Sequence, residues 1–285
     1  MTPPRRRMGH LRQGALASLV AATIVSAGCA SAPERVDALS HQLGNTRSVV
    51  RGGEFTHVVF ENAASHASGV LHVYIEGDGT PYLDRWTVAP DPTPRKPLML
   101  RLMAMDPGPA VYVGRPCYFG LATLPPCTPR DWTLDRFSER IVASLVQAIA
   151  ELRSARSPGA IELFGHSGGA TLAMLLAAQV PGVRRVVTLA GNLDPDAWTA
   201  YHGYNLLDGS LNPVRAGPLP AAIVQQHFAG ERDRIVPAWM TEVAAARIGG
   251  HGTTRLPGVT HTRGWEQAWP AILAGENPDD APPQQ

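Results

Sequence analysis

The sequence predicts one α/β domain in which helices flank a mainly parallel sheet. Three observations favour this fold class. The chain has 285 residues, of which 44% are hydrophobic, and it is therefore long enough to bury one substantial core. Short apolar runs typical of strands alternate with helical stretches along most of its length. No internal repeat is apparent.

The first 28 residues are typical of an export signal. Arg5–Arg7 and Arg12 precede an uncharged apolar run, Gly14–Gly28, that is short for a membrane span. Without this segment the chain carries 21 basic and 24 acidic residues and has no basic stripe of the kind that binds nucleic acid. We therefore expect export from the cytoplasm and no nucleic-acid partner.

The motif Ser26-Ala27-Gly28-Cys29 resembles the lipobox of bacterial lipoproteins, in which the cysteine becomes the lipidated first residue. The resemblance implies a lipid anchor on Cys29. Because Ala30 rather than aspartate follows, it also implies the periplasmic face of the outer membrane. Ordinary signal cleavage after Ala30-Ser31-Ala32 is the alternative. Residues 29–45 then comprise the lipidated cysteine and a polar tether, and residues 275–285 are expected to be a disordered tail.

Cys117 and Cys127 remain as a pair, and we expect them to form a disulfide because export implies an oxidising compartment. Closing this loop contributes about 2.8 kcal/mol in the chain-entropy model. The chain has no CxxC or HExxH motif, and its histidines are scattered. We therefore expect no metal site and no cofactor.

The elements follow in order. Residues 48–62, with Gly52-Gly53 near the middle, predict an opening β-hairpin. Thr93 is expected to cap a helix over 97–105. Apolar residues between 133 and 154 recur at the spacing of an amphipathic helix. Further strands are expected at 71–76, 111–113, 161–164, 183–190, 221–228 and 253–259, and further helices at 170–180 and 264–274.

The strongest chemical signal is Gly165-His166-Ser167-Gly168-Gly169, between a short apolar strand and an apolar helix. A serine on such a turn has a strained backbone, and the chain passes so closely on both sides that small residues are needed two positions away. Ser167 is therefore predicted to be a nucleophile. The N–H of Gly168, at the positive end of the helix, is predicted to bind a tetrahedral oxyanion. A glycine-rich turn with an incidental serine is the alternative.

With this motif in its context, the sequence resembles the α/β-hydrolase superfamily of esterases, lipases and peptidases. In that superfamily the nucleophile, the acid and the histidine follow in this order along the chain. The run from Ala229 to Pro237 resembles its acid turn, and Gly258-Val259-Thr260-His261 resembles its histidine loop. The resemblance implies that Asp233 orients His261 and that His261 takes the proton of Ser167.

Each of these assignments has a rival. Some superfamily members carry the acid after the preceding strand, where Asp194 stands, and Asp196 is expected to cap the helix that follows. His251 is the nearest rival of His261, but it precedes the last strand and so falls at the wrong end of the sheet. His166 is expected to pack within the turn rather than to catalyse.

Glu76-Gly77-Asp78-Gly79 stands where the superfamily usually shows His-Gly. We expect the backbone N–H of Asp78 to be the second oxyanion donor, provided that its carboxylate turns away. Tyr82 and Trp86 are candidates to line an acyl pocket, although isolated aromatic residues more often pack. The resemblance also implies a cap at about 191–220, and the alternative is a surface excursion packed on itself. Its apolar side chains would roof the substrate: Trp198, Tyr201, His202, Tyr204, Leu206, Leu207 and Leu211.

The resemblance covers residues 46–274 and implies the α/β-hydrolase fold with a short cap. The expected activity is hydrolysis of a carboxylic ester or related acyl bond through an acyl-enzyme. The expected partners are a small-molecule or lipid-like acyl substrate and, through the lipid anchor, a membrane. A peptidase or acyltransferase with the same residues is an alternative, because fold does not fix substrate. A non-catalytic envelope lipoprotein is another, although the complete Ser, Asp and His set argues against it.

Overall fold

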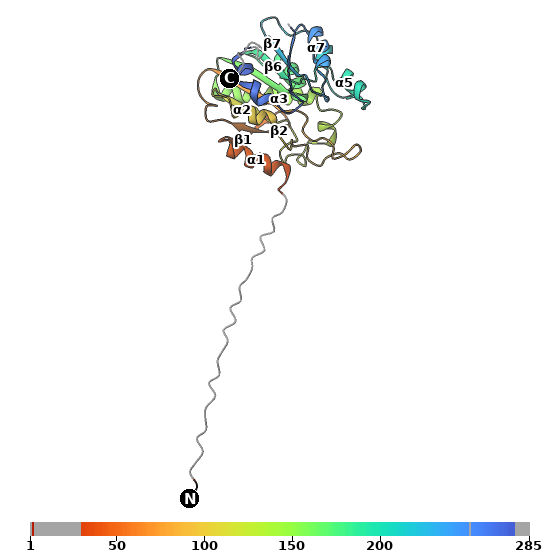
Figure 1. Ribbon diagram of the computed structural model, residues 1–285. Coiled ribbons are helices and arrows are strands. Elements are labelled where there is room, and N and C mark those ends of the chain that lie inside the picture. Colours follow the sequence, from red (N-terminus) through yellow and green to blue (C-terminus); the bar gives the residue numbers. More distant parts are fainter. Residues whose placement is uncertain (1, 3–29, 251, 277–285) are drawn as a thin grey trace. The chain divides into compact units, whose positions relative to one another are not determined.

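The computed structural model describes residues 2, 30–250 and 252–276, and from Ser31 onward the described residues form one compact unit. The predicted signal segment, Cys29, His251 and the tail beyond residue 276 lie outside the described residues. Among the described residues, no helix is long and apolar enough to cross a membrane. Helices lie on both faces of a central sheet (Figure 1).

Eight strands form the sheet, in the order β1-β2-β4-β3-β5-β6-β7-β8. β1 and β2 form the predicted antiparallel hairpin, with Gly52 opposite Phe55, and β2 also pairs antiparallel with β4. All other pairings are parallel. The strand bounds are Thr46–Gly52 (β1), Phe55–Glu61 (β2), Val70–Ile75 (β3), Ala110–Val113 (β4), Ala160–His166 (β5), Val183–Leu189 (β6), Val224–Gly230 (β7) and Thr253–Leu256 (β8).

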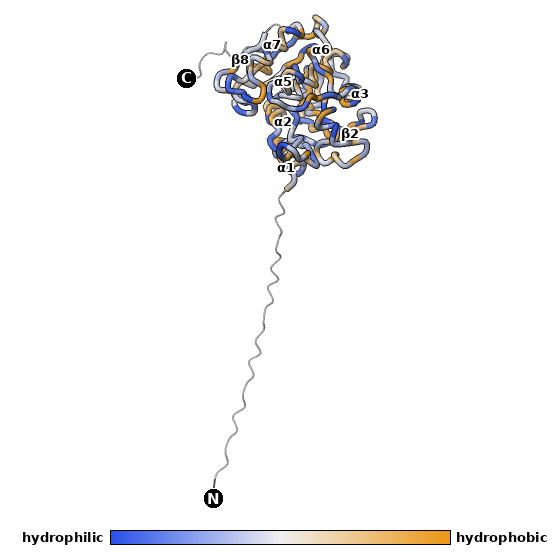
Figure 2. Tube along the Cα trace, turned by 90° about the vertical axis from the view of Figure 1, so that its right-hand side faces the viewer, coloured by the Kyte–Doolittle hydropathy of each residue, from blue (hydrophilic) through white to orange (hydrophobic). Residues whose placement is uncertain are grey.

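Among the helices, α3 contacts α4, α4 also contacts α6, and α2 contacts α8. Figure 2 shows apolar and polar stretches alternating along the chain, which is the pattern that elements with one buried side produce. The helix bounds are Ala32–Gln42 (α1), Leu98–Met103 (α2), Glu139–Arg156 (α3), Gly168–Ala177 (α4), Pro195–His202 (α5), Pro213–Ala216 (α6), Ala238–Arg247 (α7) and Trp265–Ala274 (α8), with a 3-10 helix at Pro129–Trp132.

The prediction of a tether before residue 46 is wrong for the described residues, because α1 occupies most of that segment. Ser31 and Glu34 form a capping box: the Ser31 N–H donates to Glu34 Oε2 at 2.7 Å, and the Glu34 N–H donates to Ser31 Oγ at 3.4 Å. Val36 is 1% exposed, and Leu39 and Leu43 pack against the core. Their spacing is helical, although polar residues dominate the segment.

The expected cap of α2 is also wrong. The Thr93 hydroxyl accepts the Phe119 N–H at 2.6 Å, and Pro97 is the residue that precedes the helix. The helix predicted over 133–154 begins later, at Glu139, after the 3-10 helix and a turn. These differences move the ends of elements but leave their order unchanged.

The predicted disulfide joins Cys117 and Cys127, whose Cα atoms are 5.6 Å apart. It closes the loop that follows β4. Within this loop Phe119 is buried and packs edge to face against Phe60 and Tyr112. The loop is thus part of the core.

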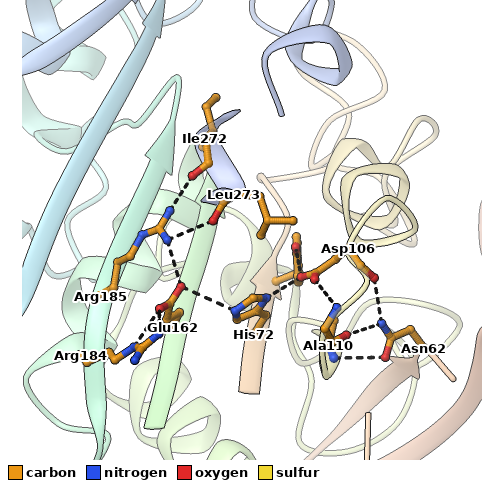
Figure 3. A network of polar contacts seen from close by, with 11 residues as sticks. Asn62, His72, Asp106, Ala110, Glu162, Arg184, Arg185, Ile272 and Leu273 are labelled. Atoms are coloured by element: carbon orange, nitrogen blue, oxygen red, sulfur yellow. Dashed lines mark hydrogen bonds and ion pairs between the residues drawn. The ribbon is translucent and has the colours of Figure 1, made fainter. Parts of the chain in front are cut away.

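A polar network joins the sheet to the last helix (Figure 3). Glu162 on β5 accepts from Arg184 at 2.7 Å and from Arg185 at 3.2 Å, both on β6. Arg185 also donates to the carbonyls of Ile272 and Leu273, at 2.6 and 3.2 Å. Carbonyls in the last turn of a helix lack partners within the helix, so Arg185 both satisfies the end of α8 and anchors it to the sheet.

Candidate active site

Ser167 occupies the turn between β5 and α4, with φ 54° and ψ −120°. Residues other than glycine rarely adopt a positive φ, and such strain gathers at functional sites. Gly165 and Gly169 must lack side chains, because neighbouring backbone atoms approach them closely. A Cβ on Gly165 would lie 2.5 Å from the Gly169 carbonyl oxygen, and a Cβ on Gly169 would lie 2.3 Å from the Ile75 carbonyl oxygen.

Three side chains from separate loops meet at this turn. His261, after β8, places Nε2 at 3.1 Å from Ser167 Oγ and Nδ1 at 2.8 Å from Asp233 Oδ2. Asp233 follows β7, and its side chain is fully buried. Its other oxygen accepts the N–H groups of Ile235 and Val236, at 2.7 and 3.0 Å. The fold therefore brings together Ser167, Asp233 and His261, the three residues that the sequence selected.

The surroundings of His261 keep its imidazole neutral, so that Nε2 is free to accept a proton. Burial lowers its pKa below the usual value, the hydrogen bond to Asp233 opposes that change, and the nearby His166 adds to it. A lowered pKa keeps the ring neutral near pH 7. With Nδ1–H donated to Asp233, the lone pair of Nε2 faces the serine hydroxyl.

His166 supports the histidine loop. Its Nε2 donates to the His261 carbonyl at 2.7 Å, and Trp265 Nε1 donates to the same carbonyl at 3.1 Å. Glu76 Oε1 lies 3.6 Å from His166 Nδ1, and Glu76 Oε2 accepts the Met99 N–H at 2.9 Å. His166 was expected only to pack, but it also fixes the backbone of the residue that contacts Ser167.

Asp78 is held by two buried arginines. Arg115 Nη1 lies 2.6 Å from its Oδ1 and Arg136 Nη1 lies 2.7 Å from its Oδ2, and the two arginine side chains are 2% and 6% exposed. Burial acts to raise the pKa of Asp78, but Arg136 and Arg115 outweigh it and lower the pKa overall. The carboxylate is therefore ionised and is neutralised by the two guanidinium groups.

The backbone around Asp78 lies directly against the serine turn. A Cβ on Gly168 would be 2.0 Å from Asp78 Oδ1, and a Cβ on Gly77 would be 3.3 Å from Ser167 Cβ. The Tyr118 hydroxyl donates to the Asp78 carbonyl at 3.0 Å. Within residues 30–250 and 252–276, the Asp78 N–H donates to no other group. The loop is thus held in place by Arg115, Arg136 and Tyr118, while the Asp78 N–H remains available to a ligand.

Comparison with solved structures identifies the fold of the chain. No protein-family model and no curated protein matches the chain, but solved structures do. An esterase from Pyrococcus furiosus is 11% identical, with a TM-score of 0.55 over 82% of this chain and 92% of the esterase. A membrane phospholipase A is 15% identical, with a TM-score of 0.55 over 87% and 92%. An α/β serine hydrolase without a lid, from Xanthomonas campestris, is 13% identical, with a TM-score of 0.52 over 81% and 93%.

The chain has the α/β-hydrolase fold. In this molecule the fold places Ser167 after β5, Asp233 after β7 and His261 after β8. Parallel strands point their carboxyl ends to one edge of the sheet, which is where open α/β sheets bind ligands.

The rival acid, Asp194, has a structural role in this hydrolase fold. It caps α5 by accepting the Ala197 N–H at 3.3 Å, and it also accepts from Asn212 at 2.8 Å. Asp196, which was expected to be the cap, lies in the first turn and forms an ion pair with Arg215 at 2.7 Å. The expectation for Asp196 is therefore corrected: the cap is Asp194, two residues earlier.

The expected cap segment, residues 191–220, contains α5 and α6. Its aromatic side chains contact one another, and Tyr201 and Tyr204 are more than half exposed. Tyr82 and Trp86 also face solvent, with exposed fractions of 36% and 81%, so neither lines a closed acyl pocket. A cavity of about 380 Å³ lies between the end of α4 and residues 210–219, and its lining includes none of Ser167, Asp233 and His261.

Sequence reasoning missed Arg115, Arg136, Tyr118 and Glu76. Glu76 was noted only as part of the Glu76-Gly77-Asp78-Gly79 turn, without its contact to His166, and the other three belong to no local motif. The two arginines come from loops after β4 and before α3. A weak signal existed in Asp78 itself, since a carboxylate beside an oxyanion site requires a neutralising partner. In the described part of the chain, no group of three or more His, Cys, Asp or Glu side chains is placed to hold a metal ion.

Proposed function

We propose that the protein is a serine hydrolase that cleaves carboxylic esters with lipid-like acyl chains. The observation that carries the proposal is the hydrogen-bonded series from Asp233 through His261 to Ser167 Oγ, with the serine on a strained turn. Two of the structurally similar proteins are an esterase and a phospholipase A, which favours an ester substrate over a peptide.

The reaction proceeds in two halves. His261 Nε2 takes the proton of Ser167 as Oγ attacks the ester carbonyl, and the N–H groups of Gly168 and Asp78 bind the oxyanion of the tetrahedral intermediate. Collapse breaks the ester bond, the alcohol leaves with the proton from His261, and an acyl-enzyme remains. Water then attacks the acyl group with His261 again as base, and the free acid is released. Asp233 stabilises the imidazolium in both halves.

Arg115 and Arg136 support the oxyanion in this mechanism. A single unpaired carboxylate at the position of Asp78 would repel the developing negative charge, and that repulsion is strong in a partly buried site. Two guanidinium groups against one carboxylate leave this cluster with a net positive charge. The cluster therefore favours the oxyanion as well as fixing the loop that carries the donor.

The test is labelling by a fluorophosphonate probe together with hydrolysis of p-nitrophenyl butyrate. Wild type and the control Ser154→Ala, which changes an exposed serine on α3, should both react with the probe and hydrolyse the ester. Ser167→Ala should do neither while keeping the same unfolding midpoint. Undiminished labelling of Ser167→Ala would refute the assignment of the nucleophile. A wild type that never labels would indicate a non-catalytic protein, and cleavage of peptides but not esters would indicate a peptidase.

We also propose that the chain is exported and anchored by a lipid on Cys29 at the periplasmic face of the outer membrane. The lipobox-like motif and the apolar run before it support this proposal. Cys29→Ser should move the protein from the membrane fraction to the soluble periplasmic fraction. An unchanged distribution would count against lipidation.

A further inference from the structure

Among the described residues, every exposed tryptophan and tyrosine lies in a segment at the edge of the sheet that carries Ser167. The exposed fractions are 36% for Tyr82, 81% for Trp86, 55% for Tyr201, 57% for Tyr204 and 47% for Trp239. These residues lie in segments that follow the carboxyl ends of β3, β6 and β7. We call residues 80–96, 198–206 and 232–239 the aromatic rim. Large exposed apolar groups that share one edge of a sheet indicate an interaction surface.

The loop that carries Trp86 is ordered. The Thr80 N–H donates to the Pro92 carbonyl at 2.8 Å and closes its neck. Asp84 Oδ1 accepts the N–H groups of Trp86 and Thr87, at 2.8 and 2.9 Å, and shapes its tip. The guanidinium of Arg85 lies 5.1 Å from the centre of the Trp86 ring. The fold therefore presents this tryptophan to solvent on a hydrogen-bonded turn.

The second part of the rim is joined to the active site. Trp198 Nε1 and His202 Nε2 both donate to the Ile235 carbonyl, at 2.7 and 2.8 Å. The N–H of the same Ile235 donates to Asp233 Oδ1. Tyr201 contacts the ring of Trp239, with 5.7 Å between the ring centres. This part of the rim is thus held in a fixed position relative to Asp233.

The rim also carries cations without carboxylate partners. Arg85, Arg95, Lys96, Arg232 and Arg234 are exposed or at the surface, and none forms an ion pair within residues 30–250 and 252–276. The exposed arginines elsewhere behave differently, with Arg51, Arg153 and Arg263 as exceptions. Most of them are paired: Arg47, Arg130, Arg140, Arg184, Arg215, Arg247 and Arg255.

We propose that the aromatic rim binds the surface of a membrane that contains anionic lipids and so brings Ser167 to acyl esters in that membrane. Tryptophan and tyrosine favour the membrane–water interface, because an apolar ring carries a polar N–H or O–H. Unpaired cations beside them are attracted by anionic headgroups. The choice of substrate rests on the proposed function, whereas membrane binding itself does not.

Two other occupants fit less well. A second copy of the chain in a symmetric contact would place the unpaired cations of one rim against those of the other. A polysaccharide would stack on the rings, but it would gain little from Leu83, Leu206 and Ile235, which are 52%, 60% and 48% exposed. Aliphatic side chains beside the aromatic rings favour lipid.

The experiment follows hydrogen exchange in the full chain carrying Ser167→Ala, so that no lipid is consumed. Vesicles of phosphatidylcholine, with or without phosphatidylglycerol, are the probe. Amides of the rim should exchange more slowly only when phosphatidylglycerol is present, while peptides from α3 and the β1–β2 hairpin should be unchanged. This local readout separates binding of the rim from any attachment through the N-terminal segment.

Charge variants sharpen the test. In the triple variant Arg85→Gln, Arg95→Gln, Lys96→Gln, the protection of the rim should fall about fivefold for each cation removed. The control is Arg51→Gln with Arg153→Gln, which removes exposed unpaired cations from other parts of the surface and should leave protection unchanged.

Three results would overturn the proposal: no protection of the rim on either vesicle, equal protection on both, or protection that grows with protein concentration when no vesicle is present. The last would indicate self-association. Esterase activity in wild type without protection would overturn membrane binding and leave the proposed function standing. Protection of the rim without esterase activity in wild type would support membrane binding and overturn the proposed function.

Discussion

The described residues contain two histidine–aspartate pairs of similar geometry, and only one of them faces a serine. His261 Nδ1 lies 2.8 Å from Asp233, and His72 Nδ1 lies 2.6 Å from Asp106. Both carboxylates are buried. The difference lies at the other ring nitrogen, which meets Ser167 Oγ at 3.1 Å in the first pair and Glu162 Oε2 at 3.7 Å in the second (Figure 3).

The positions of the two histidines along their strands explain this difference. His72 lies within β3, directly opposite Glu162 of β5 in the parallel register. His261 lies in a loop beyond the carboxyl end of β8. A side chain within a buried strand meets its neighbours in the sheet, whereas loops at the carboxyl edge can be aimed at a nucleophile and a substrate. The pair of residue types alone therefore does not define a catalytic base.

The comparison extends to two carboxylates that are each held by two arginines. Asp78 lies between Arg115 and Arg136 beside the serine turn. Glu162 lies between Arg184 and Arg185 in the network below α8. The first cluster fixes an oxyanion donor in our mechanism, and the second fixes a helix.

The largest expected effect separates the two histidine–aspartate pairs. Asp233→Asn should lower kcat by about 10⁴-fold, because the acid that orients the imidazole is lost. Asp106→Asn should leave kcat near wild type and lower stability, because Tyr74 and His72 lose a buried partner. Turnover of p-nitrophenyl butyrate and urea unfolding measure the two effects.

The rival acid provides the control for this prediction. Asp194→Asn should leave turnover intact and change stability little, because asparagine caps a helix about as well as aspartate, whereas Asp194→Ala should cost about 1 kcal/mol of stability through the lost cap of α5. If Asp194→Asn cripples folded protein while Asp233→Asn remains active, the acid belongs to the earlier strand.

The second prediction compares the two arginine-held carboxylates. Asp78→Asn leaves two buried guanidinium groups without a counter-ion, so we expect a loss of about 3–5 kcal/mol in the free energy of unfolding. It should also lower kcat by about 10²-fold, as expected when an oxyanion donor is displaced. Glu162→Gln should lower stability only. Wild-type kcat in folded Asp78→Asn would show that the cluster does not support catalysis.

How far the sequence predicts these regions depends on the distance over which each pattern acts. Ser167 was predictable because sterics dictate its neighbouring glycines. The capping box of Ser31 and Glu34 was equally local, but the polar composition of the segment obscured it. Arg115 and Arg136 are 37 and 58 residues from Asp78 in the sequence. Only the tertiary fold joins them, and no local pattern carries that information.

Changes of pH should act on activity and on stability through different histidines. Because burial lowers the pKa of His261, kcat/KM should fall by about tenfold per pH unit only below a midpoint lower than 6.5, the usual value. Protonation there removes the base. A midpoint in the pH–rate profile above 6.5 would contradict this environment for His261.

Stability should follow His57 and His227 instead. Burial lowers the pKa of each to about 4 from an ordinary value of 6.5. The unfolded chain therefore binds more protons between these values, so stability is complete above pH 6.5 and is lost as pH falls toward 4. The loss is about 3 kcal/mol for each histidine at about 1.4 kcal/mol per pKa unit. Urea midpoints measured from pH 7 to pH 4 test it.

The smallest expected effect tests whether the active site and the polar network of Figure 3 are coupled through α8. Arg185 binds the carbonyls at the end of this helix, and Trp265 at its start donates to the His261 carbonyl. Arg185→Met should lower the free energy of unfolding by about 2 kcal/mol, because hydrogen bonds from a charged donor are lost. Arg184→Met, whose side chain is 57% exposed, should cost about 0.5 kcal/mol.

Both arginine variants should keep the kcat of wild type, because Trp265 and His166 hold the His261 carbonyl independently of the far end of the helix. A fall in kcat for Arg185→Met that approaches the fall for Asp78→Asn would contradict this separation. It would mean that the end of α8 positions the histidine loop, and that the network of Figure 3 acts on the active site through the length of one helix.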